Sequence, residues 1–201
     1  SSCDMPRLRT IAHEVGARII EDACHALGAS YPQGGKVGSG AWSDMTVFSF
    51  HPVKAIAAGE GGMIVTNDAV LHEKLRELRT HGITKETSKL VDRAEAFTGN
   101  SVNPWYYEMQ QLGFNYRLTD IQSALALSQL GKLDRFIERR RQLARRYDAA
   151  LARHPRIGLR QTAGRELSAH HLYVVEIDFD KARTTRQELM TRLLTSHRMM
   201  Q

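Results

Sequence analysis

The chain has 201 residues, 42% of them hydrophobic and 25% charged, which suits a globular protein with a sizeable core. The net charge is +6, but no finger-type Cys/His spacing or aromatic-rich basic loop accompanies it, so we expect no nucleic-acid ligand. Nothing approaches the roughly 18 consecutive apolar residues of a membrane span, and SSCDMPRLRT has no signal-peptide core, so we expect a cytoplasmic protein with no membrane partner.

The first half of the chain alternates helical and extended patterns, bounded by Gly, Pro and capping residues. These patterns predict a helix over 6–16, a short buried strand over 17–22, a loop over 31–43, strands over 45–50 and 62–66, and a helix over 69–80. Asn67-Asp68 supplies the cap of the second helix.

The second half opens with an irregular polar segment over 84–114, and a segment this long in a compact protein is usually functional or disordered. After it we predict helices over 119–130 and to about 152, a strand over 170–178 and a helix over 185–195. The helix that ends near 152 carries much of the excess charge, at Arg135, Arg139, Arg140, Arg141, Arg145 and Arg146. We interpret these arginines as the solvated face of an amphipathic helix.

This order of elements predicts an α/β fold followed by the start of a smaller α+β domain. We expect residues 1–131 to belong to the large domain, 132–153 to form a connecting basic helix, and 154–201 to be an incomplete small domain.

Two sequence clusters stand at the ends of predicted strands, the edge at which open α/β sheets bind ligands. In the first, Glu21-Asp22-Ala23-Cys24-His25, an acid could hold a cationic nitrogen, although a simple loop hydrogen bond is the commoner use of such a residue. Cys24 lies in an apolar stretch and is better read as a small packed residue than as a nucleophile.

The second cluster is Phe48-Ser49-Phe50-His51-Pro52-Val53-Lys54. Most lysines are solvated, but Lys54 is flanked by apolar residues, and such surroundings favour a nucleophilic amine. The hydroxyl of Ser49 could donate to a phosphate oxygen.

Two further motifs are weaker signals. The glycines of Gly59-Glu60-Gly61-Gly62 either approach a ligand or simply turn the chain into the next strand. In Gly113-Phe114-Asn115-Tyr116-Arg117, the polar groups precede a helix N-terminus, which is a favourable place for a phosphate, but simple capping explains them equally well.

Together the motifs E-D-A-x-H, F-S-F-x-P-x-K, G-E-G-G-M-I-V-T-N-D, R-T-H-G and G-F-N-Y-R-L-T-D-I-Q-S-A-L resemble the DegT/DnrJ/EryC1/StrS sugar aminotransferases, over residues 3 to about 195. The resemblance implies part of a pyridoxal-phosphate (PLP) dependent transferase fold, with a mostly parallel sheet in the PLP-binding large domain. Ser49 to Lys54 and Pro104-Trp105-Tyr106-Tyr107-Glu108 look most like the branch that aminates a UDP-linked 4-keto-6-deoxy sugar, as in pseudaminic acid and polysaccharide biosynthesis.

The resemblance also implies a role for each matched residue. Lys54 matches the lysine that bonds PLP and then moves a proton, and Asp22 matches the carboxylate that pairs with the pyridinium nitrogen. His25 matches a position that packs near the PLP ring, and Ser49 matches a serine that binds its phosphate. Asn115 matches an asparagine that reaches the neighbouring subunit's cofactor, which implies a homodimer. The expected substrates are a nucleotide-sugar ketone and an amino-acid donor, with glutamate as the expected donor.

Family members are longer than this chain, so the resemblance also implies that it is truncated at both ends and lacks part of the phosphate cradle. An inactive or regulatory homologue that dimerises without turnover therefore stays open. Some relatives carry His where Lys54 stands and perform dehydration, which the lysine argues against. His51 and His81 lie in matched motifs without an assigned role.

Overall fold

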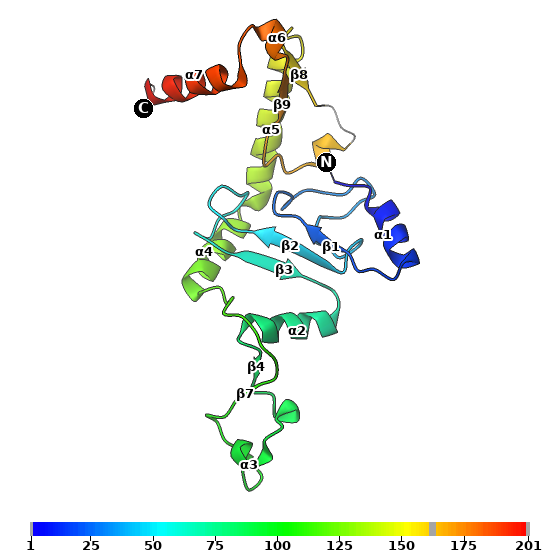
Figure 1. Cartoon of the computed structure of the whole chain (residues 1–201), viewed down its shortest axis with the longest axis vertical. Helices are drawn as coiled ribbons and strands as arrows, with labels where there is room; N and C mark the ends of the chain where they lie inside the picture. Colours follow the sequence, from blue (N-terminus) through cyan, green and yellow to red (C-terminus); the bar gives the residue numbers. More distant parts are fainter. Residues whose placement is uncertain (1, 161–163, 200–201) are drawn as a thin grey trace.

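A three-stranded sheet lies at the centre of the computed structural model, which describes residues 2–160 and 164–199 (Figure 1). Strand β1 (Ile20–Asp22) runs parallel to β2 (Met45–Ser49), with Asp22 opposite Val47. Strand β3 (Gly62–Val65) pairs antiparallel with the other side of β2. The described sheet is therefore mixed rather than mostly parallel, because the short connection over 50–61 contains no helix to carry the chain back to the start of β2.

The boundaries of the N-terminal elements lie close to those expected, with one correction. Helix α1 (Met5–Glu14) lies beside the sheet, and α2 (Ala69–Arg79) follows β3, with Asp68 Oδ1 accepting bonds from the N–H groups of Val70 and Leu71. The prediction of a buried first strand was wrong in part. β1 starts only at Ile20, and that side chain is 62% exposed because it lines an open cavity.

Residues 83–109 form an arm that projects from the sheet beyond α2 (Figure 1). At its base β4 (Ile83–Thr84) pairs with β7 (Glu108–Met109), and farther out lie η1 (Thr87–Lys89), α3 (Arg93–Ala96) and the hairpin of β5 (Phe97–Thr98) and β6 (Ser101–Val102). The segment that the sequence leaves irregular is thus folded into short elements.

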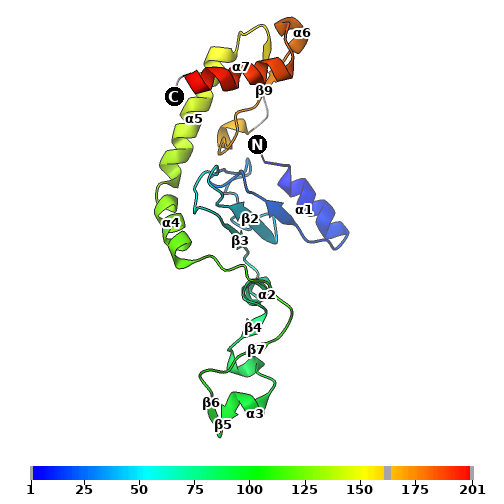
Figure 2. The same ribbon diagram turned by 60° about the vertical axis from the view of Figure 1, so that its left-hand side comes forward.

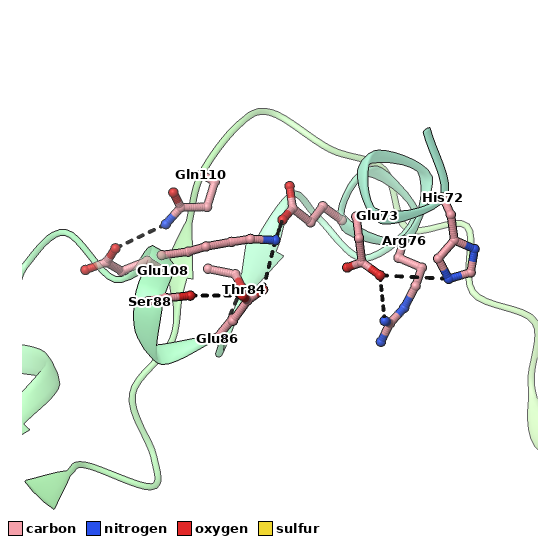
Figure 3. Close-up of polar contacts among 10 residues, drawn as sticks. His72, Glu73, Arg76, Thr84, Glu86, Ser88, Glu108 and Gln110 are labelled. Carbon is pink, nitrogen blue, oxygen red and sulfur yellow. Dashed lines mark hydrogen bonds and ion pairs between the residues drawn. The ribbon is translucent and has the colours of Figure 1, made fainter. Parts of the chain in front are cut away.

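Charged side chains hold the arm together (Figure 3). Lys89 Nζ lies 2.9 Å from both Glu77 Oε1 and Glu86 Oε2. Glu108 accepts bonds from the N–H groups of Val91 and Asp92, from the Tyr106 hydroxyl and from the Gln110 amide. These contacts join parts of an arm in which several large apolar side chains, such as Val91, Trp105 and Met109, are exposed rather than packed together.

Two consecutive helices lead from the arm to the C-terminal elements (Figure 2). Helix α4 (Asp120–Leu130) begins with a capping box between Thr119 and Gln122. Helix α5 (Leu133–Leu151) then rises away from the sheet to β8 (Ile157–Leu159), η2 (Arg165–Leu167), β9 (Val175–Ile177), α6 (Phe179–Ala182) and α7 (Arg186–Met199). β8 and β9 are antiparallel. Ser1 of the expected large domain (1–131) lies outside the described residues. So do 161–163 and 200–201 of the expected small domain (154–201).

The predicted strand over 170–178 shrinks to three residues, and the predicted solvated face of α5 is only partly solvated. Bonds from two arginines of α5 to the chain before β9 explain the partial burial. Arg140 donates to the carbonyl of His170, and Arg141 donates to those of Leu167 and Ser168. β9 is short for another reason, since its partner β8 contributes only three residues to the ladder.

The main core lies between the sheet, the loop after β1 and the start of α5. Its buried members include Tyr31, Phe48, Phe50, Ile56 and Ile137. In the ranges 2–160 and 164–199, no helix combines the length and the apolar character needed to cross a bilayer.

Candidate active site

Asp22 ends β1 and starts the turn that carries the first chemical cluster. Its Oδ1 accepts a bond from the N–H of Cys24 at 3.0 Å, while Ala23 N–H donates to the carbonyl of Val47 and ties the turn to β2. Hydrogen bonding by Cys24 lowers the pKa of Asp22, and the nearby positive charges of His25 and Lys54 act in the same direction. Asp22 is therefore a carboxylate at neutral pH, exposed at the carboxyl end of its strand.

The neighbouring acid, Glu21, is already engaged inside the protein. Its Oε2 accepts a bond of 2.6 Å from the hydroxyl of Tyr31, which is only 2% exposed, and one of 3.3 Å from Ser43. By contrast, Asp22 accepts a hydrogen bond only from its neighbour Cys24 among the described residues, at Oδ1. Successive strand residues point to opposite faces of a sheet, so one acid serves the fold and the other keeps an oxygen available for a ligand.

Cys24 behaves as the sequence suggests. Burial raises the pKa of its thiol, and the Asp22 carboxylate adds to that effect. The thiol stays protonated near neutral pH and is a poor nucleophile.

Lys54 lies on the loop that leaves β2, and the main chain on both sides of it is fixed. Its N–H donates to the carbonyl of His51 at 2.9 Å, and Ala58 N–H donates to Phe50 at 3.0 Å. Ile56 and Ala58 are buried, whereas Lys54 itself is half-buried. Val53, which the sequence places among the apolar neighbours, is 62% exposed, so the apolar surroundings lie on one side only.

The loop returns to β3 through the four-residue glycine motif, and here the turn interpretation accounts for the glycines. Gly61 has φ +139°, and a β-carbon there would lie 2.7 Å from Leu118 Cδ1. The side chain of Gln122 donates to the carbonyl of Glu60 at 3.1 Å. The start of α4 is thus packed on the end of the lysine loop, so the two motifs support one another.

His25 faces a residue that the sequence did not identify. Its ring lies against that of His171, with the centroids 4.2 Å apart and the planes inclined by 41°. Both rings line a cavity of about 460 Å³, together with Asp22, Ala26 and Ala169 among other residues. The only sequence signal for His171 is its place beside His170 in a polar segment, which does not distinguish a site residue from a solvated one.

Two expected residues remain, Ser49 and Asn115. Ser49 is half-buried at the end of β2, two residues beyond the partner of Asp22. Asn115 is exposed and forms a bridge with Thr80. No hydrogen bond or ion pair among the described residues joins Asn115 to Asp22, His25 or Lys54.

The two histidines without an assigned role have local contacts. His51 Nδ1 accepts a weak bond from the N–H of Val53, and its Nε2 lies 3.8 Å from Glu60 Oε1. His81 adopts φ +59° and donates its N–H to the carbonyl of Phe114. Among the residues described, no group of three or more His, Cys, Asp or Glu side chains could hold a metal ion.

The model of the DegT/DnrJ/EryC1/StrS aminotransferase family matches residues 1–199. The chain belongs to this family. It is 37% identical over 195 residues to the spore coat polysaccharide biosynthesis protein SpsC of Bacillus subtilis, and 35% identical over 194 residues to the UDP-4-amino-4,6-dideoxy-N-acetyl-beta-L-altrosamine transaminase of Campylobacter jejuni. Each match covers 96% of this chain and 46% of the relative, so the chain spans about half the length of these proteins.

Solved structures confirm the fold. Helicobacter pylori PseC, described as an aminotransferase involved in the biosynthesis of pseudoaminic acid, superposes with a TM-score of 0.77 at 31% identity, covering 95% of this chain and 47% of PseC. The described residues thus have a mixed α/β architecture that matches about half of the fold of a sugar aminotransferase. The cofactor of the family is PLP, and a putative sugar aminotransferase from Streptococcus pneumoniae, 25% identical, has been solved in its PLP form (TM-score 0.70, covering 88% of this chain and 45% of that one).

Proposed function

We propose that this chain provides half of a PLP-dependent aminotransferase that moves an amino group, from glutamate as donor, to the 4-keto group of a nucleotide-linked deoxy sugar. The observation that carries the proposal is the grouping of Asp22, His25 and Lys54 where the adjacent parallel strands β1 and β2 end. Bound PLP supplies an electron sink for the bond changes at the reacting carbon.

The donor set fits the cofactor at its ring. A protonated ring nitrogen needs an ionised carboxylate with a free oxygen, and Asp22 offers its Oδ2. His25, three residues later on the same turn, would lie beside the ring. Lys54 Nζ would bond the cofactor and, once displaced by the amino donor, carry a proton to and from the substrate carbon.

The phosphate would be shared between two copies of the chain. Ser49 is half-buried at the end of β2 and can donate its hydroxyl within its own subunit. Asn115 is exposed, and among the described residues no hydrogen bond or ion pair joins it to Asp22, His25 or Lys54, which supports a role in the partner's site and therefore a homodimer. We also propose that residues 1–131 act as the cofactor-binding unit, that 132–153 connect, and that 154–201 belong to a smaller unit.

The substrate assignment depends on the relatives. The Campylobacter protein is named for a UDP-linked amino sugar, and SpsC for polysaccharide biosynthesis. A nucleotide sugar with a ketone at C4 is the substrate class that we propose for this chain. A dimerising homologue without turnover is the second candidate, and the transfer assay below distinguishes the two.

Trapping the cofactor tests the proposal. The chain is incubated with PLP, reduced with borohydride, digested and analysed by mass spectrometry. We expect the pyridoxyl group on Lys54 at PLP concentrations that leave the exposed Lys36 unmodified. Lys54→Arg should abolish the modification, and the matched control Lys36→Arg should not.

Two other results are informative. Equal labelling of many lysines in both variants would contradict the assignment of Lys54. Attachment at Lys54 without transfer of the amino group from glutamate to a UDP-4-keto sugar would favour the second candidate.

A further inference from the structure

His171 follows α5 in the sequence, yet it lies beside the turn that follows β1. Its ring packs against that of His25, and both line the cavity next to Asp22. Nδ1 of His171 is buried and has no hydrogen-bond partner among the described residues. No hydrogen bond among the described residues holds this nitrogen, whereas the ring of His25 lies against the imidazole.

The main chain before His171 is held firmly in place. Ala169 is 1% exposed and belongs to the core. The carbonyl of Leu167 accepts bonds from Ser30 N–H at 3.0 Å and from Arg141 at 3.1 Å. His170 then adopts φ +46°, a left-handed conformation that few non-glycine residues take, immediately before His171. The main chain that carries His171 is therefore anchored beside the turn after β1.

We propose that His171 is a positioning residue of the cofactor site, whose ring packs on His25 and sets the face that His25 presents to the ring of bound PLP. The inference rests on the proposed function, because it takes His25 to lie beside the cofactor.

The charge state of His171 is compatible with this role. Burial lowers its pKa, and the nearby charges of His25, Lys54 and Arg140 lower it further. The imidazole is therefore uncharged near neutral pH, and two imidazoles can pack together without the repulsion that two cations would suffer.

Two substitutions separate packing from hydrogen bonding. His171→Phe keeps a flat ring but removes the nitrogens, while His171→Gln keeps hydrogen-bonding atoms but removes the ring. His72→Gln, at an exposed position on α2, is the matched control. The first readout needs no cofactor: the ring proton resonances of His25 in the full chain labelled with ¹³C-histidine, assigned with His25→Gln.

We expect the His25 resonances to keep their ring-current shift in His171→Phe and in the control, and to lose it in His171→Gln. The second readout is PLP affinity measured by fluorescence. The aromatic contact predicts a roughly two- to ten-fold weaker affinity in His171→Gln and little change in His171→Phe.

Unchanged His25 resonances in His171→Gln would overturn the inference, as would a Gln variant that preserves PLP affinity while the Phe variant loses it. Failure of the proposed function gives a different pattern. In that case borohydride does not fix PLP on Lys54 of the unmodified chain, and the His25 resonances alone decide the role of His171.

Discussion

The packing of α5 on the turn after β1 can be tested at Gly28. This residue has φ +85°, and a β-carbon there would lie 2.6 Å from Cγ1 and 3.1 Å from Cδ1 of Ile137. The Ile137 side chain is 3% exposed and has little room to move. Gly28→Ala should therefore lower the free energy of unfolding through a strained backbone and an overpacked contact.

The two contributions have different sizes and can be separated. A left-handed alanine costs about 1–2 kcal/mol, and an extra methyl group in a packed core costs about 1–3 kcal/mol, so Gly28→Ala should cost about 2–5 kcal/mol in total. Gly16 and Gly34 have φ angles of +65° and +96°, one on each side of the +85° of Gly28. A β-carbon at either position would have nothing within 4 Å. Alanine at either position should show the backbone cost alone.

Urea unfolding followed by circular dichroism measures these differences, since the midpoint and slope give the free energy of unfolding. The loss of unfolded-chain entropy from Gly to Ala is common to the three variants and cancels in the comparison. If Gly28→Ala is no less stable than the Gly16 and Gly34 variants, α5 does not pack on this turn as described.

Three further predictions follow from charged groups. Burial raises the pKa of Asp148, but hydrogen bonds from Arg165 and Tyr173 outweigh burial, and the pKa lies below its usual value of 3.8. The ionised carboxylate therefore stabilises the fold above pH 3.8, and this stabilisation is lost as the pH falls below that value. Asp148→Asn should thus lower the urea midpoint at pH 7, by a difference that shrinks below pH 3.8; a difference independent of pH would contradict this. Glu108→Gln should make the arm a preferred site of limited proteolysis while the unfolding midpoint of the remainder changes little, and unaltered cleavage would argue against it. Asp22→Asn should weaken PLP affinity by roughly ten- to hundred-fold in fluorescence titrations, because a charge-assisted bond is lost, and unchanged affinity would remove Asp22 from the site.

Local signals in the sequence located most elements correctly. Asp68 and the Thr119–Gln122 pair start α2 and α4 where capping chemistry predicts. These signals act over three or four residues, so they survive in any tertiary context. The grouping of Asp22 with Lys54 was also foreseeable, since adjacent parallel strands bring their carboxyl ends to one edge of a sheet.

Features that depend on distant partners were not foreseeable. β9 is short because the strand it pairs with, β8, contributes only three residues, and nothing within 170–178 signals this. The arm owes its order to single acids that collect several donors, above all Glu108. His171 reaches the site only because the chain returns to the sheet after α5, a contact that periodicity and spacing do not encode.

One face of α5 explains why these distant contacts occur together. Ile137, Arg140, Arg141, Ala144 and Asp148 recur at three- and four-residue spacing and therefore share one side of the helix. The first meets the turn that carries His25, the two arginines hold the main chain that leads to His171, and Asp148 bonds Arg165 in the same segment. The segments that carry both imidazoles of the proposed site thus pack on the same helix. A displacement of α5 would therefore change the packing of His25 on His171 even when neither histidine is altered, so Gly28→Ala should also shift the His25 resonances, whereas the Gly16 and Gly34 variants should not.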